Sequence, residues 1–246
     1  MAQNFGGSIV KDSLQILLNA ADPNSYPGTG TSWIDQASFI NFNTTSYTYP
    51  SFSTDKSGCF TFVNNGSTVN NIYPSSISLV TNNQTEYTRI GAFNMSSLPG
   101  DWGPIIQNQI GNNSDMALTV LSNGKLHFRQ YTNTGTGGTT SGDYGVTSTG
   151  ATLSINTWYI AAIAVSRSAQ TVNFYLNGAL DSTVSITVIG NSSSNVIVIG
   201  GAESDSYGGN RMFKGKIANV AHYGRILTAA EILQNYNAQK SRFGLT

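Results

Sequence analysis

The stretch WYIAAIAV, residues 158–165, contains only apolar and aromatic residues. A strand that faces water on one side alternates polar and apolar residues, whereas a strand covered on both sides has no such alternation. This stretch shows no alternation and is bounded by polar residues at both ends. The sequence therefore predicts a strand at the centre of a layered β structure.

Two Asn-Gly pairs, Asn123-Gly124 and Asn177-Gly178, each separate two short runs of strand-forming residues. The runs are residues 117–121 and 125–131 around the first pair and residues 172–176 and 182–187 around the second. Asn-Gly supplies the positive φ angles that tight hairpin turns require. We therefore expect two antiparallel hairpins, one on each side of the central strand in the chain.

Further alternating or apolar runs indicate more strands, at residues 14–19, 59–63, 76–80 and 87–93. Near the end of the chain, Thr228 and Glu231 have the spacing of a helix capping box, and Ile232, Leu233 and Tyr236 fall on one helix face. The sequence predicts an all-β fold: a two-sheet antiparallel sandwich with one short C-terminal helix. Composition does not change along the chain, so we expect a single domain over residues 14–238, preceded by a tether (1–13) and followed by a tail (239–246).

Composition excludes some partners. Lys and Arg together number 12, as do Asp and Glu, and only 10% of residues are charged, so the chain lacks the basic surface that nucleic acid or an acidic membrane would attract. Cys59 is the only cysteine, which rules out an intrachain disulfide. The start of the sequence has no basic, apolar segment typical of a secretory signal, and we expect no membrane span.

Several segments, in order, resemble the laminin-G-like jelly-roll domains, which are concanavalin-A-like and related to pentraxins and legume lectins. The segments are residues 124–128, 156–165, 172–178 and 213–220, followed by Tyr223, Arg225, Leu227, Thr228, Glu231 and Ile232. The resemblance covers roughly residues 14–238 and implies a jelly-roll sandwich.

A narrower resemblance concerns the two ends of the chain. Residues 6–10, 17–22 and 25–30, and the ending 234–238 with 242–245, are similar to laminin-G-like proteins of large tailed phages. Such domains serve as virion proteins, in fibres, in capsid decoration or in adhesion. The resemblance implies a location on the virion, at its surface, fibre or tail, with other virion proteins as partners.

Catalysis is disfavoured, although the same superfamily contains glycoside hydrolases. A retaining glycosidase needs two carboxyl groups about 5–5.5 Å apart. The nearest approach is Glu203-Ser204-Asp205, which reads as a loop, and His127 and His222 lie in expected strands without a nucleophile motif. We expect no enzyme.

Candidate glycan contacts come from two loops. Sugar recognition uses an exposed aromatic face together with amides or carboxylates. Asp101-Trp102 follows a Pro-Gly turn, and Tyr207 and Asn210 lie beside Glu203 and Asp205. No cofactor is expected; the alternative is a bound calcium, with oxygen ligands from Glu203 and Asp205 or from Asp22 and Asn24.

Together with the missing catalytic pair, the resemblance implies a non-enzymatic virion protein with a structural or adhesive role, assembled as a homo-oligomer, whose lectin-like domain contacts host-surface glycans. Two alternatives stay open at this point. One is a purely structural decoration protein without a ligand. The other, more distant, is a tail-associated enzyme that cleaves polysaccharide. A purely structural protein would keep host adhesion unchanged when Trp102 or Tyr207 is replaced by alanine, whereas an adhesive one would lose it. An enzyme would release reducing sugar ends from the host polysaccharide.

Overall fold

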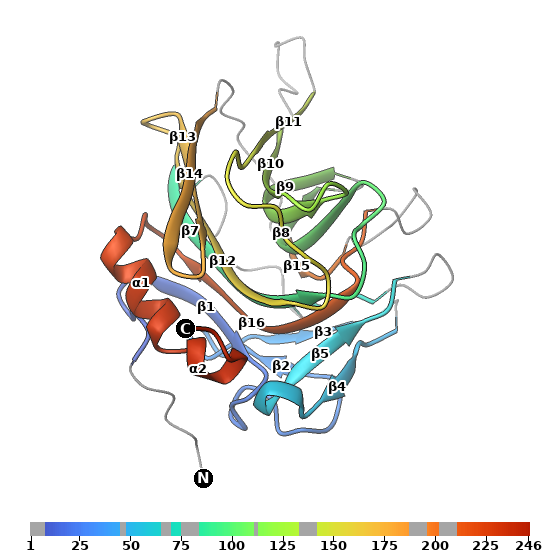
Figure 1. Ribbon diagram of the computed structural model, residues 1–246. Helices are drawn as coiled ribbons and strands as arrows, with labels where there is room; N and C mark the ends of the chain where they lie inside the picture. Colours follow the sequence, from blue (N-terminus) through green and yellow to red (C-terminus); the bar gives the residue numbers. More distant parts are fainter. Residues whose placement is uncertain are drawn as a thin grey trace.

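The computed structural model describes residues 8–44, 48–64, 70–74, 84–110, 113–132, 142–186, 196–201 and 211–246. Two β-sheets face each other, and two helices cover the outside of the larger sheet (Figure 1). A third, small sheet lies beside them. The predicted two-sheet antiparallel sandwich with its C-terminal helix is confirmed, and the third sheet is an addition that the sequence did not indicate. None of the helices in the described ranges is long and apolar enough to cross a membrane.

The larger sheet has the strand order β14-β13-β12-β7-β16-β5-β4, with β1 also paired to β16. Its strands are β1 (Leu14–Asn19), β4 (Ser51–Ser53), β5 (Cys59–Phe62), β7 (Glu86–Met95), β12 (Trp158–Ser166), β13 (Thr171–Leu176), β14 (Ala179–Ser185) and β16 (Gly215–Tyr223). All the pairings are antiparallel. A 3-10 turn, η1 (Asp55–Ser57), joins β4 to β5.

The second sheet has the order β11-β10-β9-β8-β15, and the third has the order β2-β3-β6. Their strands are β2 (Trp33–Ile34), β3 (Asn41–Asn43), β6 (Tyr73–Pro74), β8 (Trp102–Ile110), β9 (Asn113–Leu121), β10 (Leu126–Thr132), β11 (Gly142–Thr147) and β15 (Val196–Ile199). An isolated bridge between Ile72 and Ile199 links these two sheets. The strand predicted at residues 76–80 lies outside the described residues.

Strand β12 is covered on both faces, as its sequence predicts. Ile163 and Val165 belong to the core between the two large sheets. Ile160 and Ala162 belong to a second apolar cluster on the outer face, which includes side chains of α1 (Ala229–Asn237) and α2 (Lys240–Phe243). The apolar residues on both faces of the strand therefore reflect two separate cores.

Both predicted hairpins form, with different turns. Asn177 and Gly178 have φ angles of 48° and 80°, as a two-residue type I′ turn requires. In the other hairpin only Gly124 has a positive φ, 76°, and the Leu121 N–H donates to the Lys125 carbonyl. That turn is of the longer kind, in which a left-handed glycine follows a type I turn.

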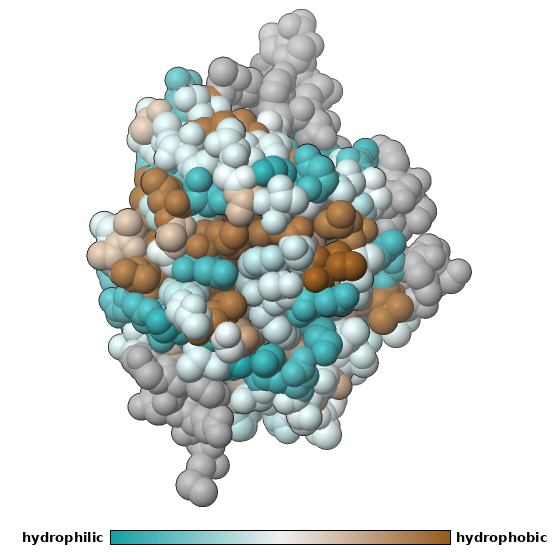
Figure 2. Space-filling view, viewed as in Figure 1, coloured by the Kyte–Doolittle hydropathy of each residue, from teal (hydrophilic) through white to brown (hydrophobic). Residues whose placement is uncertain are grey.

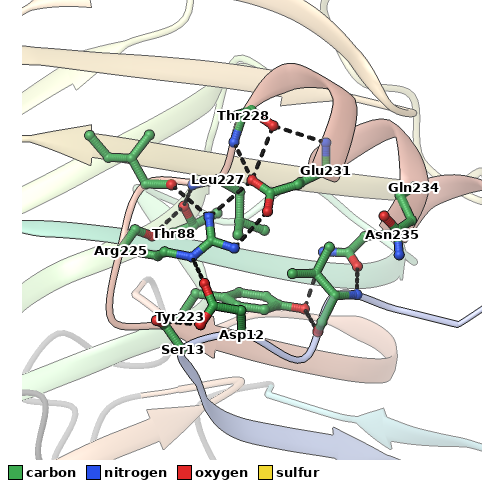
Figure 3. A network of polar contacts seen from close by, with 12 residues as sticks. Asp12, Ser13, Thr88, Tyr223, Arg225, Leu227, Thr228, Glu231, Gln234 and Asn235 are labelled. Carbon is green, nitrogen blue, oxygen red and sulfur yellow. Dashed lines mark hydrogen bonds and ion pairs between the residues drawn. The ribbon is translucent and has the colours of Figure 1, made fainter.

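Helix α1 starts with the capping box that the sequence predicts. The Thr228 hydroxyl accepts from the Glu231 N–H, and the Glu231 carboxylate accepts from the Thr228 N–H (Figure 3). The same carboxylate receives two bonds from Arg225, of 2.9 and 2.6 Å. Hydrogen bonds from Arg225 and then from Thr228 lower the pKa of Glu231 to about 2.

The described part of the predicted tether packs on the sandwich. Asp12 pairs with Arg225 at 2.7 Å, the Val10 N–H donates to Asn235 at 2.8 Å, and the Tyr223 hydroxyl donates to the Val10 carbonyl (Figure 3). Residues 1–7 lie outside the described residues. At the other end, the predicted tail contains α2, whose Phe243 ring lies 4.8 Å from the Trp158 ring. The boundaries at residues 13 and 238 stay predictions.

We predict that Glu231→Ala lowers the free energy of unfolding by about 1–2 kcal/mol at pH 7, because a helix cap and a charge-assisted hydrogen-bond pair are lost together. Urea denaturation measures this cost. Because Glu231 is deprotonated in the folded protein down to about pH 2, the difference from the wild type should shrink as the pH falls from about 4.5 towards 2. A pH-independent difference would show that the carboxylate charge is not responsible.

A polar network joins the two large sheets inside the sandwich. Arg89 of β7 is fully buried, and its Nε donates to Nδ1 of His222 on β16 at 3.2 Å. Its terminal nitrogens donate to the Met116 carbonyl on β9 and the Asn108 side chain on β8. Since a guanidinium only donates, His222 Nδ1 accepts, and Nε2 carries the proton towards Gln84 Oε1, 2.8 Å away. Burial, followed by the charge of Arg89, lowers the pKa of His222 well below its usual value.

This geometry predicts a pH-dependent stability. Above about pH 6.5 His222 is neutral in both the folded and unfolded states. Below that pH the unfolded chain takes up a proton that the folded protein does not, so the free energy of unfolding should fall by up to about 1.4 kcal/mol per pH unit between pH 6.5 and 5. Denaturation at several pH values should show this slope in the wild type and in His127→Gln, and not in His222→Gln. An equal slope in His222→Gln would contradict the assignment.

Candidate functional site

Of the six residues predicted from the sequence as glycan contacts, the structure describes two. Glu203, Asp205, Tyr207 and Asn210 lie outside the described residues. Asp101 lies just before β8 with its side chain 51% exposed, and its carboxylate pairs with Arg211 at 3.4 Å. Trp102 is the first residue of β8.

Trp102 is buried, with only 7% of its surface exposed. The guanidinium carbons of Arg129 and Arg211 lie 3.4 and 4.0 Å from the centre of its indole. Two planar cations at these heights cannot share one face of the ring, so they flank the indole, as cation–π contacts allow. The expectation of an indole presented at a loop tip is therefore corrected, because both faces that a sugar could stack on are covered.

The candidate calcium ligands are only partly described. Asp22 uses both carboxylate oxygens within the protein: Oδ1 accepts from the Asn24 N–H at 2.9 Å, and Oδ2 accepts from Gln36 Nε2 at 2.7 Å. In the described ranges no group of three or more His, Cys, Asp or Glu side chains lies close enough together to hold a metal ion. Glu203 and Asp205, the other proposed pair, lie outside those ranges.

A different aromatic residue is exposed. Among the aromatic side chains whose burial the structure describes, Phe39 alone is exposed, with 80% of its surface open to solvent. Apolar and polar residues are mixed over the face that carries the helices (Figure 2), so exposed apolar surface does not by itself mark a site. Phe39 is distinguished by the loop that holds it.

That loop, residues 35–40, connects β2 to β3 and is fixed by the fully buried carboxylate of Asp35. Asp35 Oδ1 accepts from the N–H groups of Leu17 (2.6 Å) and Ala37 (3.1 Å). Oδ2 accepts from the Ser38 N–H at 2.8 Å and from the Ser38 hydroxyl. One carboxylate thus ties the loop to itself and to β1.

Main-chain hydrogen bonds close the same loop. The Phe39 N–H donates to the Asp35 carbonyl at 2.9 Å, and the Asp35 N–H donates to the Ile40 carbonyl at 2.9 Å. Phe39 has a φ of 60°, in the left-handed region that costs an L-residue roughly 1–2 kcal/mol. Backbone strain at a non-glycine residue persists only where its surroundings impose it, and it concentrates at functional sites.

The base of the loop is packed into the core. Trp33 and Phe42, on the strands at either side, are fully buried, and Trp33 packs on Phe60 with 4.7 Å between ring centres. Exposed Asn41 lies two residues after Phe39 and can offer a planar amide to a ligand. An exposed aromatic ring on a fixed loop, with an amide close by in the chain, is the combination that sugar recognition uses.

Sequence reasoning missed Phe39, because a lone phenylalanine among short strands is usually a core residue. The signal that could have indicated it is Asp35 followed by Ser38, residue types that form side-chain turns.

We predict that Phe39→Gly leaves the free energy of unfolding within about 1 kcal/mol of the wild type, on the more stable side, because glycine accepts the positive φ and little buried surface is lost. Phe42→Ala is the control. Phe42 is fully buried three residues away, and its truncation should cost about 3–5 kcal/mol. Urea denaturation compares the two. A cost above about 2 kcal/mol for Phe39→Gly would mean that Phe39 serves packing.

Solved structures with the same fold include binding domains and an enzyme. The chain is similar to the binding domain of Paraclostridial mosquitocidal protein 1 (TM-score 0.68, 13% identity, 95% of this chain and 55% of that one). It is also similar to the receptor-binding domain of botulinum neurotoxin type G (TM-score 0.64, 18% identity, 95% and 54%). A third similar structure is Trypanosoma rangeli sialidase in complex with the inhibitor DANA (TM-score 0.64, 12% identity, 100% and 37%). At these identities the likeness shows the fold alone, and the chain spans between about a third and just over half of those structures.

No curated protein matches the chain in sequence. Residues 65–233 match the Laminin_G_3 family, described as the concanavalin A-like lectin/glucanases superfamily. The match extends from the residues before β6 into helix α1, and it includes every strand of the second sheet. The chain therefore belongs to the concanavalin A-like lectin/glucanase superfamily, as a laminin-G-like member.

Proposed function

We propose that the protein is a non-enzymatic glycan-binding module in which Phe39 stacks on a sugar ring, and that it serves as an adhesion component of a tailed-phage virion. The observation that carries the glycan proposal is the 80% exposed ring of Phe39, held at a positive φ by the buried carboxylate of Asp35. Because the backbone of this loop is already fixed by hydrogen bonds, binding costs little loop ordering, so more of the contact energy appears as affinity.

The fold family and the similar structures support a binding role. Lectins give the superfamily part of its name, and two of the similar structures are binding domains of toxins. The sialidase likeness covers 37% of that enzyme's chain at 12% identity, so it concerns the fold and not the chemistry. These findings favour recognition over hydrolysis.

The virion context rests on the resemblance of the two chain ends to laminin-G-like proteins of large tailed phages. We propose that other virion proteins are its partners and that it acts as a homo-oligomer in a fibre, in the tail or at the capsid surface. A single shallow contact around one aromatic ring binds weakly, and several copies on one particle supply avidity without new contacts.

The binding claim is tested on a glycan array with the purified chain, using the wild type, Phe39→Ala and Leu180→Ala. Leu180, on β14, is 56% exposed and controls for the loss of an exposed apolar side chain elsewhere. We expect Phe39→Ala to weaken binding roughly tenfold, since about 1.4 kcal/mol of stacking corresponds to a factor of ten. Leu180→Ala should bind as the wild type does.

A fourth variant, Tyr207→Ala, tests the loop predicted from the sequence. If Tyr207→Ala abolishes binding and Phe39→Ala does not, the sugar binds at the Glu203, Asp205, Tyr207 and Asn210 loop, and the assignment to Phe39 is wrong. If no glycan binds the wild type, even when it is displayed in many copies, the purely structural role of the chain replaces the adhesive one.

A further inference from the structure

Arg167 is a buried cation without a partner. It follows the last residue of β12, Ser166, and is only 2% exposed. Its Nε and both terminal nitrogens are buried, and none of the three has a hydrogen-bond partner or an ion pair among the described residues. Arg89, another buried arginine, uses its three nitrogens on His222, Met116 and Asn108.

The register of β12 places Arg167 on the side of the sheet that faces the second sheet. Ile163 and Val165 face that inner core, and residue 167 continues the same alternation. The Arg167 N–H donates to the Thr85 carbonyl at 2.8 Å, so the strand pairing with the chain leading into β7 extends to this residue. Arg167 therefore lies at the end of the sandwich where β12 ends and β7 begins.

Glu86, the acid on the neighbouring strand β7, makes no ion pair with Arg167 among the described residues, and its Oε2 is likewise buried without a hydrogen-bond partner. Glu86 pairs in register with Ser166, and its Oε1 accepts from the hydroxyls of Ser166 (3.0 Å) and Ser168 (2.5 Å). Residues 166 and 168 alternate to the opposite face from residue 167, so the carboxylate and the guanidinium lie on different sides of the strand.

A guanidinium remains protonated in proteins and offers five N–H donors in a planar fork. A buried charge without a counter-charge is unfavourable, and a buried polar group without a partner in a folded protein points to a missing water or ion. Arg167 therefore needs hydrogen-bond acceptors for its N–H groups and a negative charge to balance its own. Waters supply only the acceptors, whereas an anion with two coplanar oxygen atoms supplies both.

We propose that Arg167 is the anchor of an oxyanion-binding site between the two large sheets, separate from the Phe39 loop. The ligand class is a carboxylate, sulfate or phosphate, which the guanidinium holds through two parallel hydrogen bonds. The anion comes either from an acidic sugar or from a free inorganic ion. Because Arg167 is only 2% exposed, the pair forms away from bulk water.

The test is thermal unfolding of the full chain at constant ionic strength, in sodium chloride, sulfate, phosphate, glucuronate and N-acetylneuraminate, with neutral glucose as the sugar control. Arg167→Met keeps the aliphatic length of the side chain and removes the charge. Arg167→Lys keeps the charge and removes the planar guanidinium. Lys11→Gln is the control, because it removes one exposed positive charge elsewhere.

The wild type and Lys11→Gln should gain about 5–10 °C in Tm at an anion concentration a hundredfold above Kd. Arg167→Met should gain nothing, and in chloride it should be as stable as the wild type or more stable, because an unpaired buried charge is gone. Arg167→Lys should show a smaller gain than the wild type. A response to the sugar acids assigns the site to an acidic glycan, and a response to sulfate or phosphate alone assigns it to a free ion.

Three results would overturn the proposal: no anion-specific gain in the wild type, an equal gain in Arg167→Met, or a lower Tm of Arg167→Met in chloride that anions do not change. The last would show that Arg167 stabilises the fold without a ligand. Phe39→Ala should keep the full anion response, so failure at one site is distinguishable from failure at the other.

Discussion

Strand β7 lies between β12 and β16 in the larger sheet, and the other layers of the molecule rest on its two faces. Tyr87 and Phe93 point into the core shared with the second sheet. Ile90 and Ala92 point to the opposite side, where they lie in the cluster that contains Ile232, Tyr236 and Phe243 of the C-terminal helices. A sheet covered on both faces cannot be stable without both covers. The C-terminal helices, together with Val10 in the same cluster, cover that outer face of the sheet.

Much of this arrangement could be predicted because the deciding signals are local. The apolar run at residues 158–165, the two Asn-Gly turns and the Thr228–Glu231 capping box each specify their own structure within a few residues. The third sheet could not be predicted, since β2 and β6 have only two residues each and depend on long-range pairing. Nor could the Arg89–His222 network, because an arginine at an inward-facing position reads in sequence as a solvent-exposed one.

The candidate site was less predictable for a related reason: sequence indicates which side chains are able to stack on a sugar, and tertiary packing decides which of them are exposed. Trp102 follows a Pro-Gly turn and looks presented, yet Arg129 and Arg211 cover it. Phe39 looks like a core residue, yet the carboxylate of Asp35 turns the chain so that its ring points into solvent. A positive φ at a bulky residue is imposed by such surroundings, and the only local mark of it here is the pair Asp35 and Ser38, whose residue types form side-chain turns.

The central claim is that recognition takes place at the Phe39 loop, and the most direct measurement is an experimental structure of the chain with an oligosaccharide that it binds. The account predicts a sugar ring stacked on the Phe39 side chain at van der Waals distance, about 4 Å, with the Asp35 hydrogen bonds unchanged. An oligosaccharide bound elsewhere, with the Phe39 ring still exposed to solvent, would contradict it.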